Sequence, residues 1–390
     1  MIDESGIIPP VTAPGMRGGN VGSGVPGRRS SLRLPLPPSP VKFIPMRAMV
    51  MTTIAAPLEV REVPEPTAPE NGVVVRVHAT GLCGSDWHAW AGHEELTLPH
   101  IPGHELAGVV SAVGPDVWNW SVGDRVTVPF VCGCGDCEWC RSGDAQVCPN
   151  QEQPGFTHAG SFAESVALHA ADTNLVAIPE GVSFEAAAAL GCRFATAYRA
   201  LTARAKVTPR EWVTVVGAGG VGLSAVMIAK ALGAQVIAVD RSPGALEAAR
   251  NLGADHGILA DGQDVPAAVR EITGEGSQVS VDAVGSEATC AAAVLSLRRR
   301  GRHVQIGLLP TETGLSQVPM ARAIAYELDL LGSHGMAAAD YPEMLALIAS
   351  GALRPQDLIE RVVGLEEAAL LLPDQPKSGT PGMTMIDPAL

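Results

Sequence analysis

The spacing of apolar positions divides the chain into a strand-rich first part and an alternating second part. From Val73 onward, β-branched runs such as VVVRVHATG, ELAGVVSAVG and DRVTVPFV are bounded by Gly, Pro or Asp, which predicts strands to about residue 180. A helical stretch, EAAAALGCRFATAYRAL, follows. Strands such as WVTVV and QVIAVD then alternate with helices of ten or more residues. This alternation predicts parallel βαβ units, so we expect an α/β protein of about two domains.

Residues 1–45 lack this patterning and are rich in Pro and Gly. A segment with few large apolar side chains cannot offset the entropy lost on ordering, so we predict a disordered tail. A mis-assigned start is the alternative, since Met46, Met49 and Met51 are candidate initiators.

Charge and hydropathy narrow the classes of partner. Net charge is −14 without a long basic run, which argues against a nucleic-acid or anionic-membrane partner. The apolar runs are broken by Gly, so none reaches the ~20 residues that a membrane helix needs.

The strand WVTVV leads into a glycine-rich turn, Gly217–Gly222, which spells G-x-G-x-x-G before a helical run. Such a turn lets the backbone approach a pyrophosphate at the helix N-terminus. The next strand ends in Asp240, whose carboxylate can accept both ribose hydroxyls of NAD. Arg241 follows directly and leaves strict preference for NAD over NADP open. The competing interpretation is a glycine turn in an α/β domain that binds no nucleotide.

Eight cysteines are the clearest compositional feature, and four of them are spaced C-x2-C-x2-C-x7-C: Cys134, Cys137, Cys140 and Cys148. Four thiolates in one loop favour a closed, structural zinc site. A redox pair or disulfides are the alternatives, although a redox pair needs only two cysteines. Cys132 and Cys290 have no predicted role.

Three further residues could form a second metal site. Cys83 follows one predicted strand, His104 precedes another, and Cys192 lies at the seam before the glycine turn. Three protein ligands leave a fourth position open, as in catalytic zinc sites. Taken singly, each also fits a buried thiol or an ordinary loop histidine.

Five segments together resemble the zinc-dependent medium-chain alcohol dehydrogenases. They are GLCGSDWH, GHELAGVVSAVGPDV, CGDCEWCRSGDAQVC, GCRFATAY and VGAGGVG, in the family's order over most of residues 47–390. The resemblance implies a Rossmann coenzyme domain, residues 194–331, inserted in a GroES-like, β-rich catalytic domain, residues 47–193 and 332–390.

The resemblance also implies roles for single residues. Cys83, His104 and Cys192 would hold the catalytic zinc, with Glu105 behind it as an alternate ligand. Asp86 would orient the ring of His104. The predicted proton relay comprises Ser85 and His88. The predicted coenzyme contacts are Gly217, Gly219, Gly220, Val221, Gly222, Asp240, Arg241, Thr196, Val284, Ile306 and Leu308.

The chain departs from the family pattern at three points. The third ligand is Cys192, where polyol-dehydrogenase relatives carry Glu, which favours simple alcohols. No arginine for the pyrophosphate stands near the C-terminus, where Gly382-Met383-Thr384 is found. The segment around His334 has no assigned role.

We therefore predict a cytoplasmic, NAD-dependent zinc alcohol dehydrogenase that acts on a small-molecule alcohol or aldehyde and forms a homodimer or homotetramer. The alternatives are a polyol, amino-alcohol or glutathione-adduct dehydrogenase of the same family, or a non-catalytic protein that binds NAD and zinc.

Overall fold

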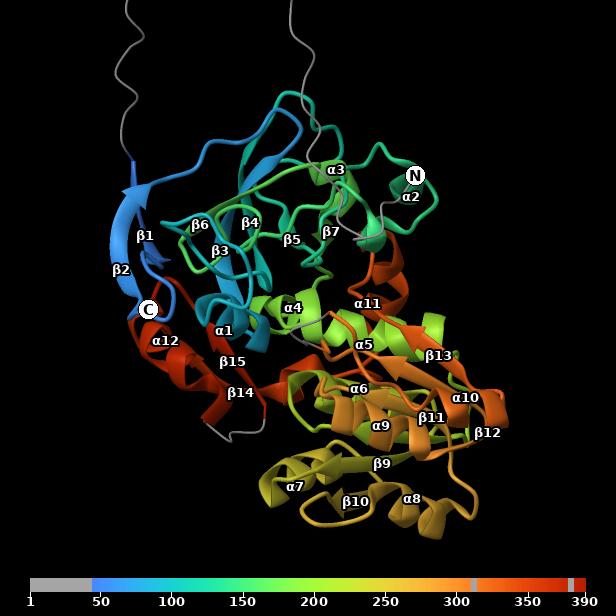
Figure 1. The fold of residues 1–390 in the computed structure, drawn as a ribbon. Helices are drawn as coiled ribbons and strands as arrows, with labels where there is room; N and C mark the ends of the chain where they lie inside the picture. The colour runs from blue at the N-terminus through green and yellow to red at the C-terminus, as the bar shows by residue number, and fades with distance from the viewer. Residues whose placement is uncertain (1–43, 310–313, 378–381) are drawn as a thin grey trace, which may run out of the picture. The chain divides into compact units, whose positions relative to one another are not determined.

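The computed structural model describes residues 44–309, 314–377 and 382–390 (Figure 1). Residues Phe43–Leu390 form one compact unit. The predicted disordered tail lies outside the described residues except for its last two positions. Of these two, Pro45 already begins strand β1 (Pro45–Val50), which pairs antiparallel with β2 (Glu59–Pro64).

The first part of the chain and the C-terminal segment together form a mostly antiparallel sheet. Its strand order is β14-β15-β3-β4-β5-β7, and β6 pairs with β3. Its strands are β3 (Val73–Leu82), β4 (Leu106–Val113), β5 (Arg125–Thr127), β6 (Ser165–Leu168), β7 (Val176–Ala177), β14 (Ile359–Val363) and β15 (Met383–Ile386). Strand β15 pairs with β3, so the C-terminal segment completes a sheet begun near the N-terminus. The helices that accompany this sheet are α1 (Gly84–Trp90), α2 (Glu138–Arg141), α3 (Ala171–Asn174), α11 (Tyr341–Ala349) and α12 (Leu365–Leu371).

The second sheet is parallel, with strand order β10-β9-β8-β11-β12-β13. Its strands are β8 (Trp212–Val216), β9 (Gln235–Asp240), β10 (His256–Leu259), β11 (Ser277–Asp282), β12 (Leu297–Gln305) and β13 (Asp329–Gly332). Its helices are α6 (Gly220–Ala231), α7 (Pro243–Asn251), α8 (Val265–Thr273), α9 (Glu287–Leu295) and α10 (Met320–Tyr326). The order reverses between β8 and β11, and ligands of open parallel sheets bind at such a point. The glycine turn follows β8 there.

One long helical segment joins the two sheets. The sequence predicted a continuous helix, but α4 (Phe184–Ala188) and α5 (Ala195–Arg199) are separated and followed by π-helical turns, η2 (Leu190–Phe194) and η3 (Ala200–Arg204). Short π-helical turns occur frequently at functional sites. Cys192 lies within the first of them.

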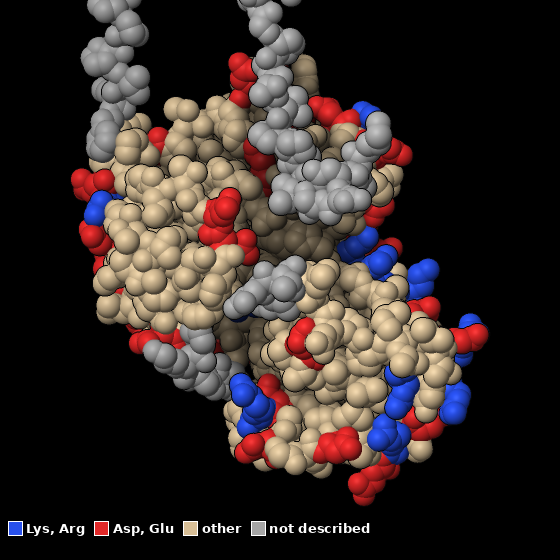
Figure 2. All heavy atoms as spheres, in the orientation of Figure 1, with Lys and Arg blue, Asp and Glu red and all other residues tan. Residues whose placement is uncertain are grey.

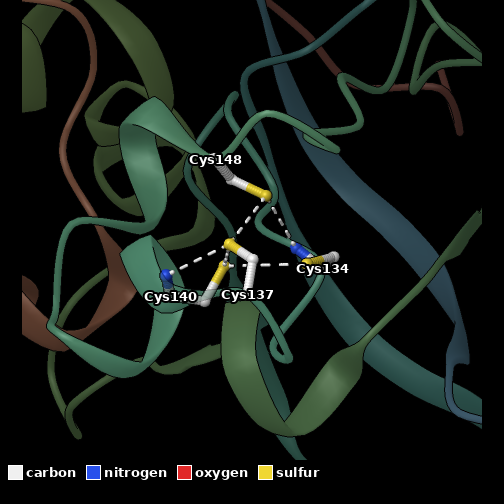
Figure 3. Close-up of side chains that lie close together, drawn as sticks. All are labelled: Cys134, Cys137, Cys140 and Cys148. Carbon is white, nitrogen blue, oxygen red and sulfur yellow. Dashed lines mark hydrogen bonds between the residues drawn. The ribbon is translucent and has the colours of Figure 1, made fainter.

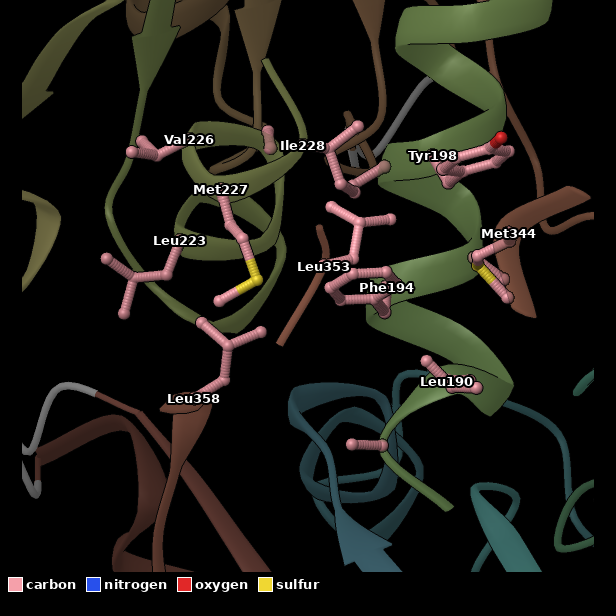
Figure 4. Close-up of a cluster of buried hydrophobic side chains, with 14 of the residues drawn as sticks. Leu190, Phe194, Tyr198, Leu223, Val226, Met227, Ile228, Met344, Leu353 and Leu358 are labelled. Carbon is pink, nitrogen blue, oxygen red and sulfur yellow. The ribbon is translucent and has the colours of Figure 1, made fainter. Parts of the chain in front are cut away.

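The largest apolar core lies where this segment packs against α6 (Figure 4). Leu190 and Phe194 are fully buried in this core, which also contains Leu223 and Ile228 of α6 and Leu353 of the C-terminal segment. The same core therefore holds together the two sheets and the helix that carries Cys192.

The predicted fold class, a Rossmann domain inserted in a GroES-like domain, is confirmed. The domain boundaries stay predictions. Among the described helices, none is both long and apolar enough to span a membrane. On the face shown in Figure 2, Lys and Arg are interspersed with Asp and Glu, and the surface is hollowed between the two halves.

Candidate active site and metal centres

The four-cysteine loop forms a compact cluster of sulfur atoms (Figure 3). The Cys137 sulfur lies 3.5 Å from that of Cys140 and 3.6 Å from that of Cys148, and Cys134 lies 4.0 Å from Cys140. A tetrahedral zinc with ligand bonds of about 2.3 Å separates its sulfur ligands by roughly 3.8 Å. The observed spacing therefore fits a four-thiolate zinc site.

Backbone N–H groups in this loop point at the sulfurs. Cys137 caps α2 and accepts from the N–H of Cys140 at 3.4 Å, and Cys148 accepts from Asn150 at 3.3 Å. The N–H groups of Asp136 and Cys137 lower the pKa of the Cys134 thiol to about 6. The lowered pKa favours the thiolate form of Cys134, the form that binds metal. Cys132 stays outside the cluster, and burial raises the pKa of its thiol to about 12.

A second cluster brings together Cys83, His104, Glu105 and Cys192, whose ligand atoms lie within 4.8 Å of one another. Cys83 is the residue between β3 and α1, and the pair His104-Glu105 immediately precedes β4, the neighbour of β3. Adjacent strands thus place two of the groups, and the π-helical turn places Cys192 from the joining helix. The sequence alone did not show that these segments meet.

Asp86 organises this cluster from the first turn of α1. Its carboxylate accepts the N–H of Cys83 at 2.9 Å and of Gly103 at 3.2 Å, and its Oδ1 lies 3.0 Å from His104 Nδ1. The other ring nitrogen, Nε2, is buried and has no hydrogen-bond partner among the described residues. A fully buried imidazole nitrogen left unpaired next to two thiols fits a metal ligand, because an unpaired buried polar atom is otherwise costly.

Glu105 is held by an arginine that the sequence analysis did not single out. Arg193 follows Cys192 and forms a buried ion pair with the Glu105 carboxylate. Burial raises the pKa of Glu105, and the guanidinium offsets part of that shift. The signal in the sequence was that Arg193, directly after a predicted ligand, is the only charged residue between Glu185 and Arg199 of the helical run.

Ser85 and His88 lie on α1 next to Cys83, both partly exposed. No hydrogen bond joins their side chains within the described part of the chain. Instead His88 Nδ1 lies 2.8 Å from Nδ1 of His93, an exposed residue beyond the helix end. Burial, and then the neighbouring His93, lower the pKa of His88. His88 is therefore neutral near pH 7 and can accept a proton.

The glycine turn has the close contacts that the motif requires. Gly217 adopts a φ of 92°, and a Cβ on Gly222 would lie 1.8 Å from the Gly217 carbonyl oxygen. A Cβ on Gly219 would meet nothing within 4 Å, so that side of the turn is open to an approaching group.

Asp240 ends β9 beside this turn. Its carboxylate accepts the N–H of Ala218 at 2.7 Å and of Ser242 at 2.8 Å, whereas Arg241 is exposed. Asp240 therefore stabilises the glycine turn, and it also places a carboxylate at the carboxyl end of β9.

The other predicted coenzyme contacts lie in the joining helix, in the first turn of α6 and after strands β11 and β12. The Thr196 hydroxyl donates to the Cys192 carbonyl at 2.7 Å, so it lies one helical turn from a predicted metal ligand. Val221 is in the first turn of α6 and is half-buried. Ile306 and Leu308 follow β12, and Val284 follows β11. Val284 and Leu308 are largely exposed.

Aromatic rings surround the second cluster. The ring of His104 lies 5.1 Å from that of Phe156 and 6.0 Å from that of Phe130, between ring centres. The ring of His334 lies edge-on to Phe130 at 5.2 Å. His334 therefore lies near the metal-ligand cluster rather than at a remote site.

Two family models match this chain. The alcohol dehydrogenase GroES-like domain matches residues 69–180, and the zinc-binding dehydrogenase domain matches residues 220–350.

Individual relatives match over most of their length. An alcohol dehydrogenase of Geobacillus stearothermophilus is 38% identical over 79% of this chain and 90% of its own. An NAD-dependent alcohol dehydrogenase of Sulfurisphaera tokodaii is 33% identical over 83% and 94%.

Solved structures agree with these matches. Alcohol dehydrogenase TADH from Thermus sp. ATN1 superposes with a TM-score of 0.81 at 32% identity, covering 88% of this chain and 99% of that one. Benzyl alcohol dehydrogenase from Acinetobacter calcoaceticus superposes with a TM-score of 0.82 at 28% identity, with the same coverage.

Proposed function

This chain belongs to the zinc-dependent medium-chain alcohol dehydrogenase family, and we propose that it transfers a hydride between a small alcohol and NAD, giving an aldehyde or ketone. The observation that carries the proposal is the buried, unpaired Nε2 of His104 beside Cys83 and Cys192. Thr196, a proposed coenzyme contact, follows Cys192 by one turn in the same helical segment. One segment thus joins the metal site and the coenzyme site.

The chemistry divides between the bound groups and the chain. Zinc, when bound, lowers the pKa of an alcohol, and NAD accepts the hydride. Cys83, His104 and Cys192 would hold the catalytic metal, and Asp86 would fix the tautomer of His104. Cys134, Cys137, Cys140 and Cys148 hold the structural zinc.

The chain also handles the proton. Ser85 accepts the hydrogen bond of the substrate hydroxyl, and His88 receives the proton at its imidazole and passes it toward solvent. A histidine suits this step because the unperturbed pKa of its imidazole lies near neutrality. Arg193 donates hydrogen bonds to both oxygens of the Glu105 carboxylate and so holds it in an ion pair. Glu105 is therefore an alternate rather than a permanent metal ligand.

The coenzyme site uses the crevice between β8 and β11. The glycine turn receives the pyrophosphate at the N-terminus of α6, and Asp240 receives the adenosine ribose. Thr196, Val221, Val284, Ile306 and Leu308 line the nicotinamide end.

The test is turnover of a panel of alcohols, followed as NADH formation with and without a zinc chelator. The panel contains simple primary and secondary alcohols, a polyol, an amino alcohol and a glutathione adduct. We expect turnover of at least one simple alcohol. A chain that binds two zinc ions and NADH but turns over no panel member would instead be a non-catalytic member of the family.

A variant pair isolates the metal site. Cys83→Ala removes a proposed ligand and should lower kcat/KM at least about a hundredfold, since a Lewis-acid metal supplies several kcal/mol of transition-state stabilisation. NADH binding should persist. The matched control is Cys290→Ala, which removes a buried thiol from α9 and should leave turnover unchanged. Full activity in Cys83→Ala would refute this ligand set.

Assembly and location are part of the same proposal. The chain acts in the cytoplasm as a homodimer or homotetramer, and its catalytic domain comprises residues 47–193 and 332–390 around a coenzyme domain of residues 194–331. Light scattering of the purified protein distinguishes these assemblies from a monomer.

A further inference from the structure

Arg193 is a buried arginine, and two of its three guanidinium nitrogens donate hydrogen bonds to Glu105 of the metal-ligand cluster. Its side chain is 7% exposed. Nε donates to the two Glu105 oxygens at 3.0 and 3.2 Å, and Nη2 donates to Oε2. The backbone N–H of Arg193 also donates to Oε1 of Glu105, at 3.1 Å. Glu105 therefore fixes the position of this guanidinium.

The other side of the guanidinium lies against the start of α6. A Cβ built on Gly220 would lie 2.6 Å from Arg193 Cδ and 3.2 Å from Nη1. Any side chain at position 220 would displace the arginine. Across residues 44–309, 314–377 and 382–390, Nη1 has no hydrogen-bond partner. One nitrogen of a guanidinium that is paired with Glu105 is thus held beside the first residue of α6, with no hydrogen-bond partner among the described residues.

This place already favours an anion. Helix α6 has 12 residues, and its N-cap, Gly219, provides no side-chain cap. The first N–H groups of such a helix and its dipole attract negative charge. An arginine fork matches phosphate oxygens in charge and geometry. Nη1 and the helix N–H groups therefore point to one phosphate-binding position.

We propose that Arg193 binds a phosphate of the NAD pyrophosphate through Nη1 while it holds Glu105 through Nε and Nη2. This rests on the proposed function, because the anion is that of the coenzyme. Arg193 fills the role left open by the absence of an arginine at Gly382-Met383-Thr384.

A shared arginine also links the two sites energetically. A phosphate at Nη1 and the Glu105 carboxylate at Nε and Nη2 share the positive charge of one guanidinium, so coenzyme binding alters how strongly Arg193 holds a carboxylate beside the metal ligands. Coupling of this kind is reciprocal. Removal of the Glu105 charge should therefore change how much Arg193 contributes to coenzyme affinity.

The test measures binding of NADH and of ADP-ribose, which carry the pyrophosphate, and of adenosine, which lacks it. In Arg193→Gln we expect the Kd of NADH and of ADP-ribose to rise about 10- to 100-fold, the range for a hydrogen bond to a charged group. The Kd of adenosine should stay within about twofold. Arg193→Lys keeps the charge without the fork and should recover part of the affinity.

The matched control is Arg302→Gln, which breaks another partly buried arginine–glutamate pair, with Glu211, at the opposite end of the parallel sheet. It should leave all three dissociation constants unchanged. A double-mutant cycle with Glu105→Gln tests the link, and non-additivity of at least about threefold in NADH affinity is expected.

Three outcomes would overturn the inference. Unchanged NADH affinity in Arg193→Gln rejects the phosphate contact and leaves the proposed function standing. Equal weakening of NADH and adenosine assigns Arg193 to the shape of the site alone. Failure of the native chain to bind NADH rejects the coenzyme part of the proposed function and this inference with it.

Discussion

At the residue scale, Asp86 shows how a single side chain arranges a metal site. It lies three positions after Cys83 and receives the backbone N–H groups on both sides of the cluster as well as the ring of His104. The resemblance implied the contact with His104. The contact with the Cys83 N–H is local to the start of α1, whereas the contact with Gly103 appears only in the fold, because Gly103 comes from another loop.

Asp86→Asn should weaken zinc binding about 10- to 100-fold, since loss of an outer partner of a ligating histidine has that effect. Competition with a zinc chelator measures it. Asp172→Asn is the control, because Asp172 accepts two backbone N–H groups at 2.9 and 3.0 Å and contacts no predicted ligand. Equal zinc affinity in the two variants would contradict this role of Asp86.

A second residue-scale prediction concerns pH. Burial lowers the pKa of His88 and the neighbouring His93 lowers it further, so His93→Ala should raise that pKa. Alcohol oxidation needs neutral His88 as proton acceptor, and activity is lost as pH falls through its pKa. The acid limb of the kcat/KM profile should therefore move to higher pH in His93→Ala. It should not move in His169→Ala, which removes a half-buried histidine outside α1. A limb that stays in place in both variants would remove His88 from the relay.

At the element scale, the four-cysteine loop has little regular structure of its own beyond α2 and one 3-10 turn. Its shape depends on backbone bonds to sulfur and on Asn174, which bonds both backbone groups of Gly133. Such a loop gains its stability from the metal. The spacing predicted this element in full, since all ligands lie within one short segment.

In Cys140→Ser we expect one bound zinc ion per chain instead of two. The melting temperature should fall by roughly 2–4 °C for each kcal/mol by which the free energy of unfolding decreases. Metal analysis by atomic emission and a thermal melt measure both effects. Cys290→Ser provides the comparison and should keep both ions. Retention of two zinc ions in Cys140→Ser would mean that the loop binds no metal through this thiol.

At the scale of the whole molecule, stability and function share one core. Phe194 follows Arg193, is fully buried, and packs where the joining helix meets α6 (Figure 4). Phe194→Ala should destabilise the protein by about 3–5 kcal/mol, because a large cavity remains. Leu370→Ala, at a side chain 77% exposed, should change stability by less than about 0.5 kcal/mol. Denaturant unfolding compares the two, and equal losses would contradict the central place of this core.

The sequence by itself determined the features whose parts lie close together along the chain. Apolar, β-branched runs that alternate with helical segments predicted strands β8 and β9 at Trp212–Val216 and Gln235–Asp240, and short spacing predicted the glycine turn and the four-cysteine loop. Only the tertiary structure decided the rest. It brought Cys83, His104 and Cys192 into one cluster, interrupted the joining helix with π-helical turns, and placed Arg193 between Glu105 and Gly220. These contacts join residues far apart in sequence, and they depend on how the two sheets pack around one buried helix, which no local pattern encodes.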